Sequence, residues 1–128
     1  MKKSLKFFAT LGVNQGYGHA NELASAIEVV AKEWQKAAAE VYSESGVYVG
    51  AVIQDSKTVY HTDWGCPVGG EITATISGEV NPLYTDINQY KDAVITVLEK
   101  VAVALKQSTT QLFFVEGDFV YLDFRNEK

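Results

Sequence analysis

The sequence predicts an α+β domain in which two helices lie on one face of a mainly antiparallel sheet. One observation is a run of apolar residues spaced three and four apart after position 21, the pattern of a helix packed on a core. Another is the alternation of apolar and hydroxyl side chains over 71–78, which indicates a strand with one buried face. The third is the length of 128 residues, which suits a single domain over 1–128.

The first part of the chain is predicted to hold one strand and one long helix. Residues 4–13 read as a strand, and 14–21 as a glycine turn that leads into the helix. Asn21 is expected to cap the helix and Gly46 to end it. The apolar residues that share one helical face are Leu23, Ile27, Val30, Trp34, Ala38 and Val41.

The middle of the chain is predicted to form three strands. The first is expected over 46–53 and the second over 57–62, joined by a hairpin turn at 54–57. The third is expected over 71–78, after a stretch rich in glycine. In this third strand the apolar side chains are expected to face the helices and the Thr and Ser side chains to face away from them.

A second helix is predicted over 87–106, with Thr85 or Asp86 as its cap. Its outward side also carries apolar residues, including Ile95 and Val103, and a helix without a polar side is normally covered on both sides. We therefore expect a homo-oligomer in which another subunit supplies the second cover. The alternative is that part of this segment is a strand, because it contains many β-branched residues.

The chain is predicted to close with a hairpin of strands 110–115 and 119–124 around a turn at 116–118. The resulting order is strand, helix, three strands, helix, two strands. This is a split β-α-β arrangement with additional strands, which corresponds to a ferredoxin-like α+β sandwich.

Composition narrows the classes of function. The net charge of −5 and the single arginine, Arg125, argue against nucleic-acid binding, which needs a basic face. No segment is apolar over the roughly 20 residues that a membrane span requires. We interpret the basic start of the chain as part of the first strand and not as a signal peptide. With one cysteine no internal disulfide can form, and the expected location is the cytoplasm.

The segment HTDWGCPVGGE, residues 61–71, concentrates reactive and aromatic side chains. Tyr60, His61, Asp63, Cys66 and Glu71 could in principle bind a metal or supply a nucleophile and a base. The paired spacings of a zinc site are absent, so we expect no metal, and Cys66 is expected to be packed and not reactive. Two interpretations stay open: a glycine-dependent turn, or a lid in which His61, Asp63 and Trp64 contact a ligand.

A second candidate is the segment NQGYGHAN, residues 14–21, between the first strand and the first helix. Backbone N–H groups at a helix start favour an anion, and Asn14, Gln15, Tyr17 and His19 would add side-chain contacts. Arg125 is a further candidate, because arginine binds carboxylate or phosphate with two parallel hydrogen bonds. The alternative for Arg125 is an ordinary surface residue.

Leu11, Gly12 and Asn14, together with the segment Gly46-Val47-Tyr48, resemble small phage- and prophage-encoded α+β proteins of tautomerase-like or ferredoxin-like layout. The resemblance implies the fold and a phage type of origin. Tautomerases use an amino-terminal proline as base, whereas this chain begins Met1-Lys2-Lys3.

Together these features favour a non-enzymatic, oligomeric protein that binds a small polar or nucleotide-like ligand, such as a nucleotide signal, without a cofactor. The ligand is expected between segments 14–21 and 61–71. One alternative is a small isomerase or lyase that uses His61 with Asp63 or Cys66. The other is a protein-interaction or inhibitor module with an acidic surface.

Overall fold

The structure is a computed structural model that describes residues 2–13 and 26–125. The elements in chain order are β1 (Lys2–Gly12), α1 (Ala26–Ser45), β2 (Val52–Thr58), the short 3₁₀ helix η1 (Thr62–Trp64), β3 (Glu71–Glu79), α2 (Ile87–Ala104) and β4 (Leu112–Phe119). None of the helices in these ranges is long and apolar enough to cross a membrane.

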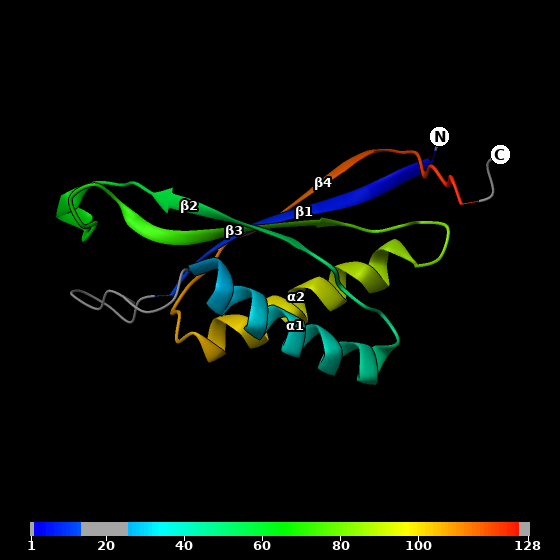
Figure 1. Cartoon of the computed structure of the whole chain (residues 1–128), viewed down its shortest axis with the longest axis horizontal. Helices are drawn as coiled ribbons and strands as arrows, with labels where there is room; N and C mark the ends of the chain where they lie inside the picture. The colour runs from blue at the N-terminus through cyan, green and yellow to red at the C-terminus, as the bar shows by residue number, and fades with distance from the viewer. Residues whose placement is uncertain (1, 14–25, 126–128) are drawn as a thin grey trace.

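The four strands form one antiparallel sheet in the order β2-β3-β1-β4. Both helices lie against the same face of this sheet, as Figure 1 shows. The connection β1-α1-β2-β3-α2-β4, with β1 and β3 at the centre, is the ferredoxin-like split β-α-β arrangement. The predicted fold class is therefore confirmed. We call the face without helices the open face.

Two predicted hairpins are wrong, and both fall on edge strands. The expected turn at 54–57 lies inside β2, which pairs with β3 from Val52 opposite Ser77 to Thr58 opposite Glu71. The expected turn at 116–118 lies inside β4, which continues to Phe119. An edge strand has solvent on one side and tolerates polar residues and glycine, so its sequence is similar to that of a turn.

The helices agree with the predicted pattern where the structure describes them. α1 ends at Ser45, and Gly46 follows with a left-handed backbone (φ 77°) and donates its N–H to the Tyr42 carbonyl at 2.8 Å. The predicted cap Asn21 lies outside the described residues. Asp86 caps α2, because its carboxylate accepts the Gln89 N–H at 3.0 Å.

The core fills the space between the helices and the sheet. Phe7 of β1 is fully buried and stacks on Trp34 of α1, with ring centroids 5.7 Å apart. The Trp34 indole N–H donates to the Val49 carbonyl at 3.0 Å, so the segment before β2 is also held against α1. On β3, Ala74 and Ile76 are buried beneath the helices, as the alternation predicts, whereas Ile72, predicted on the same face, is 46% exposed.

Candidate functional site at one end of the sheet

Several connections meet at one end of the sheet, which we call the tip end. β2 ends there at Thr58, opposite Glu71 at the start of β3, so residues 59–70 form a loop at this end. β1 ends beside it, with Gly12 opposite Thr73. In Figure 1 this tip loop, residues 59–70, is the green turn at the left, beyond the end of the helices.

The tip loop depends on glycine and on a buried cysteine. Gly65 and Gly70 have left-handed backbones (φ 104° and 97°), and a Cβ on Gly70 would lie only 2.9 Å from Val59 Cγ2. Cys66 is buried, with its Sγ 3.5 Å from the Tyr60 backbone nitrogen and 3.3 Å from the Pro67 carbonyl oxygen. These contacts support the packed interpretation of the thiol.

The structure brings the predicted residues His61, Asp63 and Trp64 together in η1. His61 Nδ1 accepts the Asp63 backbone N–H at 3.1 Å, and its ring centroid is 5.8 Å from that of Trp64. Trp64 is 77% exposed, so its ring is available to a ligand but contributes little to the core. These three residues form the solvent-facing rim of the tip loop.

Behind this rim lie Tyr60 and Glu71. The sequence indicated both as candidates, together with His61, Asp63 and Cys66, but did not show which of these residues pair. The Tyr60 hydroxyl donates to Glu71 Oε2 at 3.1 Å, across the base of the tip loop. Gly12 faces the same place: a Cβ built on it would lie 3.2 Å from both Glu71 Oε1 and Gln107 Oε1. The glycine therefore leaves room for a carboxylate and an amide that come from two other parts of the chain.

A group of hydroxyls continues from this pair along the open face. Thr73 Oγ1 lies 2.8 Å from Ser56 Oγ and 3.1 Å from Thr58 Oγ1, which joins β2 to β3 through side chains. Thr73 is 2% exposed although it points away from the helices. The polar side of β3 is thus ordered by hydrogen bonds next to Glu71.

The other predicted site residues are not part of this group in the structure. Asn14, Gln15, Tyr17 and His19 lie outside the described residues, although Val13, which precedes them, is at the tip end. Arg125 lies at the opposite end, since β4 leaves the sheet beside Lys2 (Figure 1).

Arg125 has a local carboxylate partner. Its Nε donates to Asp123 Oδ1 at 2.9 Å. This hydrogen bonding lowers the pKa of the Asp123 carboxyl and raises that of the guanidinium. The pair is exposed, which agrees with the alternative of an ordinary surface residue.

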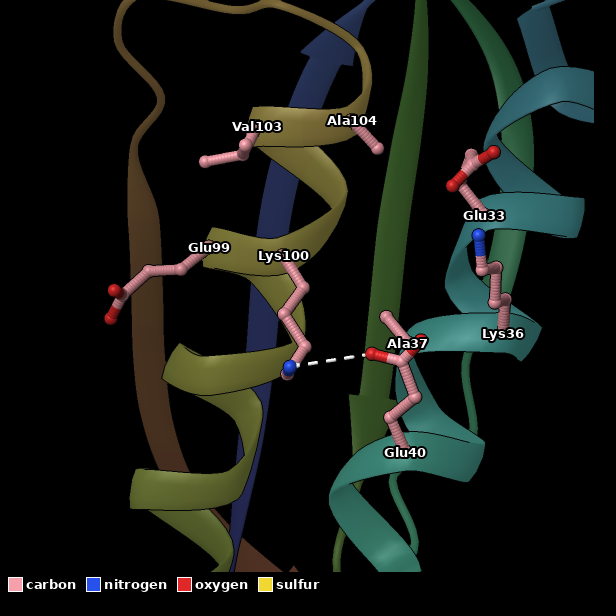
Figure 2. A pocket seen from close by; sticks show the side chains of 8 residues that line it. All are labelled: Glu33, Lys36, Ala37, Glu40, Glu99, Lys100, Val103 and Ala104. Carbon is pink, nitrogen blue, oxygen red and sulfur yellow. Dashed lines mark ion pairs between the residues drawn. The ribbon is translucent and has the colours of Figure 1, made fainter.

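A separate groove of about 430 Å³ runs between the outer sides of α1 and α2. Figure 2 shows that Lys100 and Ala104 of α2 point towards Glu33, Lys36, Ala37 and Glu40 of α1, and Lys100 Nζ lies 3.3 Å from Glu40 Oε2. Val103 points away from α1 in this view and is 76% exposed. Ile95 and Val103 are the outward apolar residues predicted to bind a second subunit, and that contact stays a prediction.

Metal binding finds no support in the described ranges. Among residues 2–13 and 26–125, no group of three or more His, Cys, Asp and Glu side chains is placed to hold an ion.

This geometry defines the class of protein: a ferredoxin-like domain with a polar site at one end of its sheet. The model of the SAM lyase family matches residues 2–123. The chain therefore belongs to the SAM lyase family. A sequence search of curated proteins finds no match.

Among solved structures, the chain is similar to a phage SAM lyase in complex with S-methyl-5'-thioadenosine, with 13% identity over 88% of this chain and 81% of that one and a TM-score of 0.56. The designed protein Foldit4 matches with 9% identity over 93% and 100% of the two chains and a TM-score of 0.47. A designed ferredoxin-fold protein matches with 14% identity over 100% and 96% and a TM-score of 0.39.

These findings confirm the resemblance to small phage-encoded α+β proteins. They also show that the expectation of a non-enzymatic binding protein is wrong, because the family is one of enzymes. The sequence favoured a binder over a lyase because no pair of catalytic side chains was fixed by spacing. A small-molecule ligand remains consistent with the family.

Proposed function

We propose that this protein is a lyase that cleaves S-adenosylmethionine (SAM) and releases S-methyl-5'-thioadenosine, with its reaction centre beside Tyr60 and Glu71. The family match over residues 2–123 carries the proposal. The contact between Tyr60 and Glu71 supports the location, because it places a carboxylate next to the hydroxyl groups of Ser56, Thr58 and Thr73 on the open face. SAM is a cytoplasmic metabolite, which agrees with the predicted location.

Release of S-methyl-5'-thioadenosine breaks the bond between the sulfonium sulfur and Cγ of the methionine part. The bond's electron pair goes to sulfur, which becomes a neutral thioether. A lyase adds no water at this step; in the proposed mechanism the carboxylate of the substrate itself attacks Cγ and closes a five-membered lactone. The carboxylate and the sulfonium lose their charges together and no proton is transferred. Such a reaction requires chiefly that the substrate be held in the folded, reactive geometry.

In this proposal Glu71 supplies the negative charge that attracts the cationic substrate, whose amino-acid end carries an ammonium group. Tyr60 holds one carboxylate oxygen through its hydroxyl, so the other oxygen is free to turn towards the substrate. His61, Asp63 and Trp64 form the outer rim. Asn14, Gln15, Tyr17 and His19 remain proposed contacts, because the strand that leads to them ends at the same place.

The experiment is to incubate the purified protein with SAM in ¹⁸O-labelled water and to identify both products by mass spectrometry. We expect S-methyl-5'-thioadenosine and homoserine lactone. Any homoserine formed later by opening of the lactone carries the label in its carboxyl group. Label in the γ-hydroxyl would show direct hydrolysis instead, and absence of S-methyl-5'-thioadenosine would contradict the proposed function.

Glu71→Gln tests the location of the reaction. The variant keeps the size of the side chain and an acceptor for the Tyr60 hydroxyl but loses the charge, and we expect kcat/KM to fall by about 100-fold. The matched control is Glu79→Gln, the same change at the far end of the same strand. Equal activity of both variants would place the reaction elsewhere.

Homo-oligomerisation is part of the proposal. Beyond β4, the side chains of Val120, Tyr121, Leu122 and Phe124 are each more than half exposed. Such a run of exposed apolar residues is typical of a subunit contact. Light scattering is expected to give a multiple of the 14.1 kDa chain mass, and Leu122→Asp is expected to reduce it.

A further inference from the structure

The side of α1 and α2 that faces away from the sheet holds two grooves in succession. The groove of about 430 Å³ beside Lys100 lies between 33–40 of α1 and 99–104 of α2. A second groove, of about 260 Å³, lies between 41–45 of α1 and 89–96 of α2, with Val47 beside it. The two helices are therefore antiparallel, and the grooves follow each other along the line where the helices meet. We call this line, with both grooves, the helix seam.

The helix seam has a length and a floor that suit a third helix. Glu33 and Glu44 line its two ends on α1 and are eleven positions apart, which corresponds to about 16 Å or three helical turns. The floor is small and apolar, because Ala37, Val41 and Ala93 are all buried there. Small side chains at the floor let a further helix approach the seam closely.

The rims of the helix seam are acidic. They carry five carboxylates and two ammonium groups, a net charge of −3, from Glu33, Glu40, Glu44, Asp92 and Glu99 against Lys36 and Lys100. Among the described residues only one of these carboxylates has an ion pair, that of Glu40 with Lys100 (Figure 2). The other four are exposed or half-buried and have no ion pair within the same ranges. Their charge is available to a cationic partner.

The carboxylates also repeat at a helical interval. Glu33 and Glu40 are seven residues apart on α1, and Asp92 and Glu99 are seven residues apart on α2. Seven residues make two helical turns, about 10.5 Å. Residues that repeat every seven positions lie on the same side of a helix. Lysine or arginine at this interval on a helix in the seam would therefore meet carboxylates on both rims.

A second copy of the chain fits the helix seam less well than a basic partner does. A symmetric contact between two copies brings the same surface of each together, so the carboxylates would face one another. Like charges that meet at an interface reduce affinity. The exposed apolar run 120–124, to which we assign the subunit contact above, lies beyond β4 and not on the helices.

We propose that the helix seam is the docking surface for a basic amphipathic helix of another protein. Its narrow apolar stripe lies on the floor formed by Ala37, Val41 and Ala93, and its lysine or arginine side chains meet the two acidic rims. The seam is on the helix side of the sheet, whereas Tyr60 and Glu71 pair at the tip end beside the open face. A bound partner leaves the proposed reaction centre uncovered, and the inference goes beyond the proposed function without depending on it.

The test uses fluorescence anisotropy with a labelled helical peptide of about 15 residues, which has leucine on one narrow stripe and lysine on both flanks. We expect the wild-type protein to bind it, and to bind it more weakly as the salt concentration rises from about 0.05 to 0.5 M. A peptide with glutamate in place of lysine should not bind. A peptide with serine in place of leucine should bind about tenfold more weakly, because it has no apolar stripe for the floor.

Charge reversals locate the peptide on the protein. Glu44→Lys changes the rim on α1 and Asp92→Lys the rim on α2, and each should weaken the lysine peptide by about tenfold. The matched control is Glu116→Lys on β4, which changes the net charge by the same amount at an exposed position of the sheet. It should bind as the wild type does. Urea midpoints of all variants verify that they are folded.

Several outcomes would overturn the docking surface. Equal weakening by Glu116→Lys would show a response to net charge alone, and equal binding of the leucine and serine peptides would show that the grooves are not used. If Glu44→Lys changes the oligomer mass and leaves peptide binding intact, the seam is a contact between copies. The rate of SAM cleavage should be the same with the peptide bound, and a slower rate would place the peptide at the reaction centre instead. A wild type that binds the peptide at the seam but does not cleave SAM contradicts only the proposed function.

Discussion

Gly78→Ala tests how closely the sheet packs on the core. Gly78 of β3 lies opposite Phe7, and a Cβ at this position would be 2.5 Å from Phe7 Cε2 and 2.7 Å from the Gly50 carbonyl oxygen. Both distances are far below van der Waals contact. The Phe7 ring has little freedom to move away, because it is fully buried and stacked on Trp34.

The expected loss in the free energy of unfolding combines two effects. Forcing an extra methyl group into a packed core costs about 1–3 kcal/mol. Displacing Phe7 from Trp34 sacrifices part of an aromatic contact worth about 0.5–1.5 kcal/mol. Alanine recovers about 0.5–1 kcal/mol relative to glycine within a strand. The net loss is about 0.5–4 kcal/mol, out of a total stability of roughly 5–15 kcal/mol.

Urea unfolding followed by circular dichroism measures this loss. The matched control is Gly117→Ala in β4, where no heavy atom lies within 4 Å of the added Cβ. It should be neutral or slightly more stable than the wild type. Combining Gly78→Ala with Phe7→Leu should cost less than the sum of the two changes, because the smaller side chain leaves room. A Gly78→Ala protein as stable as the Gly117→Ala control would refute the reasoning.

Three further predictions concern single side chains. Burial raises the pKa of Tyr90 above its ordinary value of 10, so the unfolded chain ionises first and wild-type stability should fall as the pH rises above this value. In Tyr90→Phe, urea unfolding across this pH range should show a smaller fall. Asp86→Ala removes the cap that accepts the Gln89 N–H and should lower stability by about 1 kcal/mol in thermal unfolding, whereas Asp86→Asn should largely retain it. Cys66→Ser should cleave SAM at the wild-type rate, because a hydroxyl can replace the thiol near the Tyr60 N–H; lost activity at unchanged stability would identify a reactive thiol.

The sequence was sufficient to predict the helices and the central strands. Periodicity is clear in α1, α2 and β3 because apolar residues recur on the side of each element that packs on the core. The edge strands β2 and β4 lack such a regular pattern. One border of each strand is unpaired, so its residues are exposed to solvent at that border as well as on one face. Polar residues inside them were therefore interpreted as turns.

The candidate site was predictable only in part. The glycines and the single cysteine of the tip loop indicated a candidate site there. His61, Asp63 and Trp64 do lie together in this loop. The pairing of Tyr60 with Glu71 depends on the register of β2 and β3, which the misplaced hairpin concealed. β1 also pairs with β4, and no local sequence pattern reports which distant strands become neighbours.

The central position of β1 has a consequence for the order of events during synthesis. β1 is synthesised before the other strands, yet Lys2 pairs with Phe119 of β4, which is synthesised after them. At about 5–20 residues per second, roughly 5–20 s pass before that partner exists. During this interval Phe7 and Leu11 have no complete core to enter. The charges of Lys2 and Lys6, which precede these apolar residues in β1, are then expected to keep the waiting segment from associating with other nascent chains.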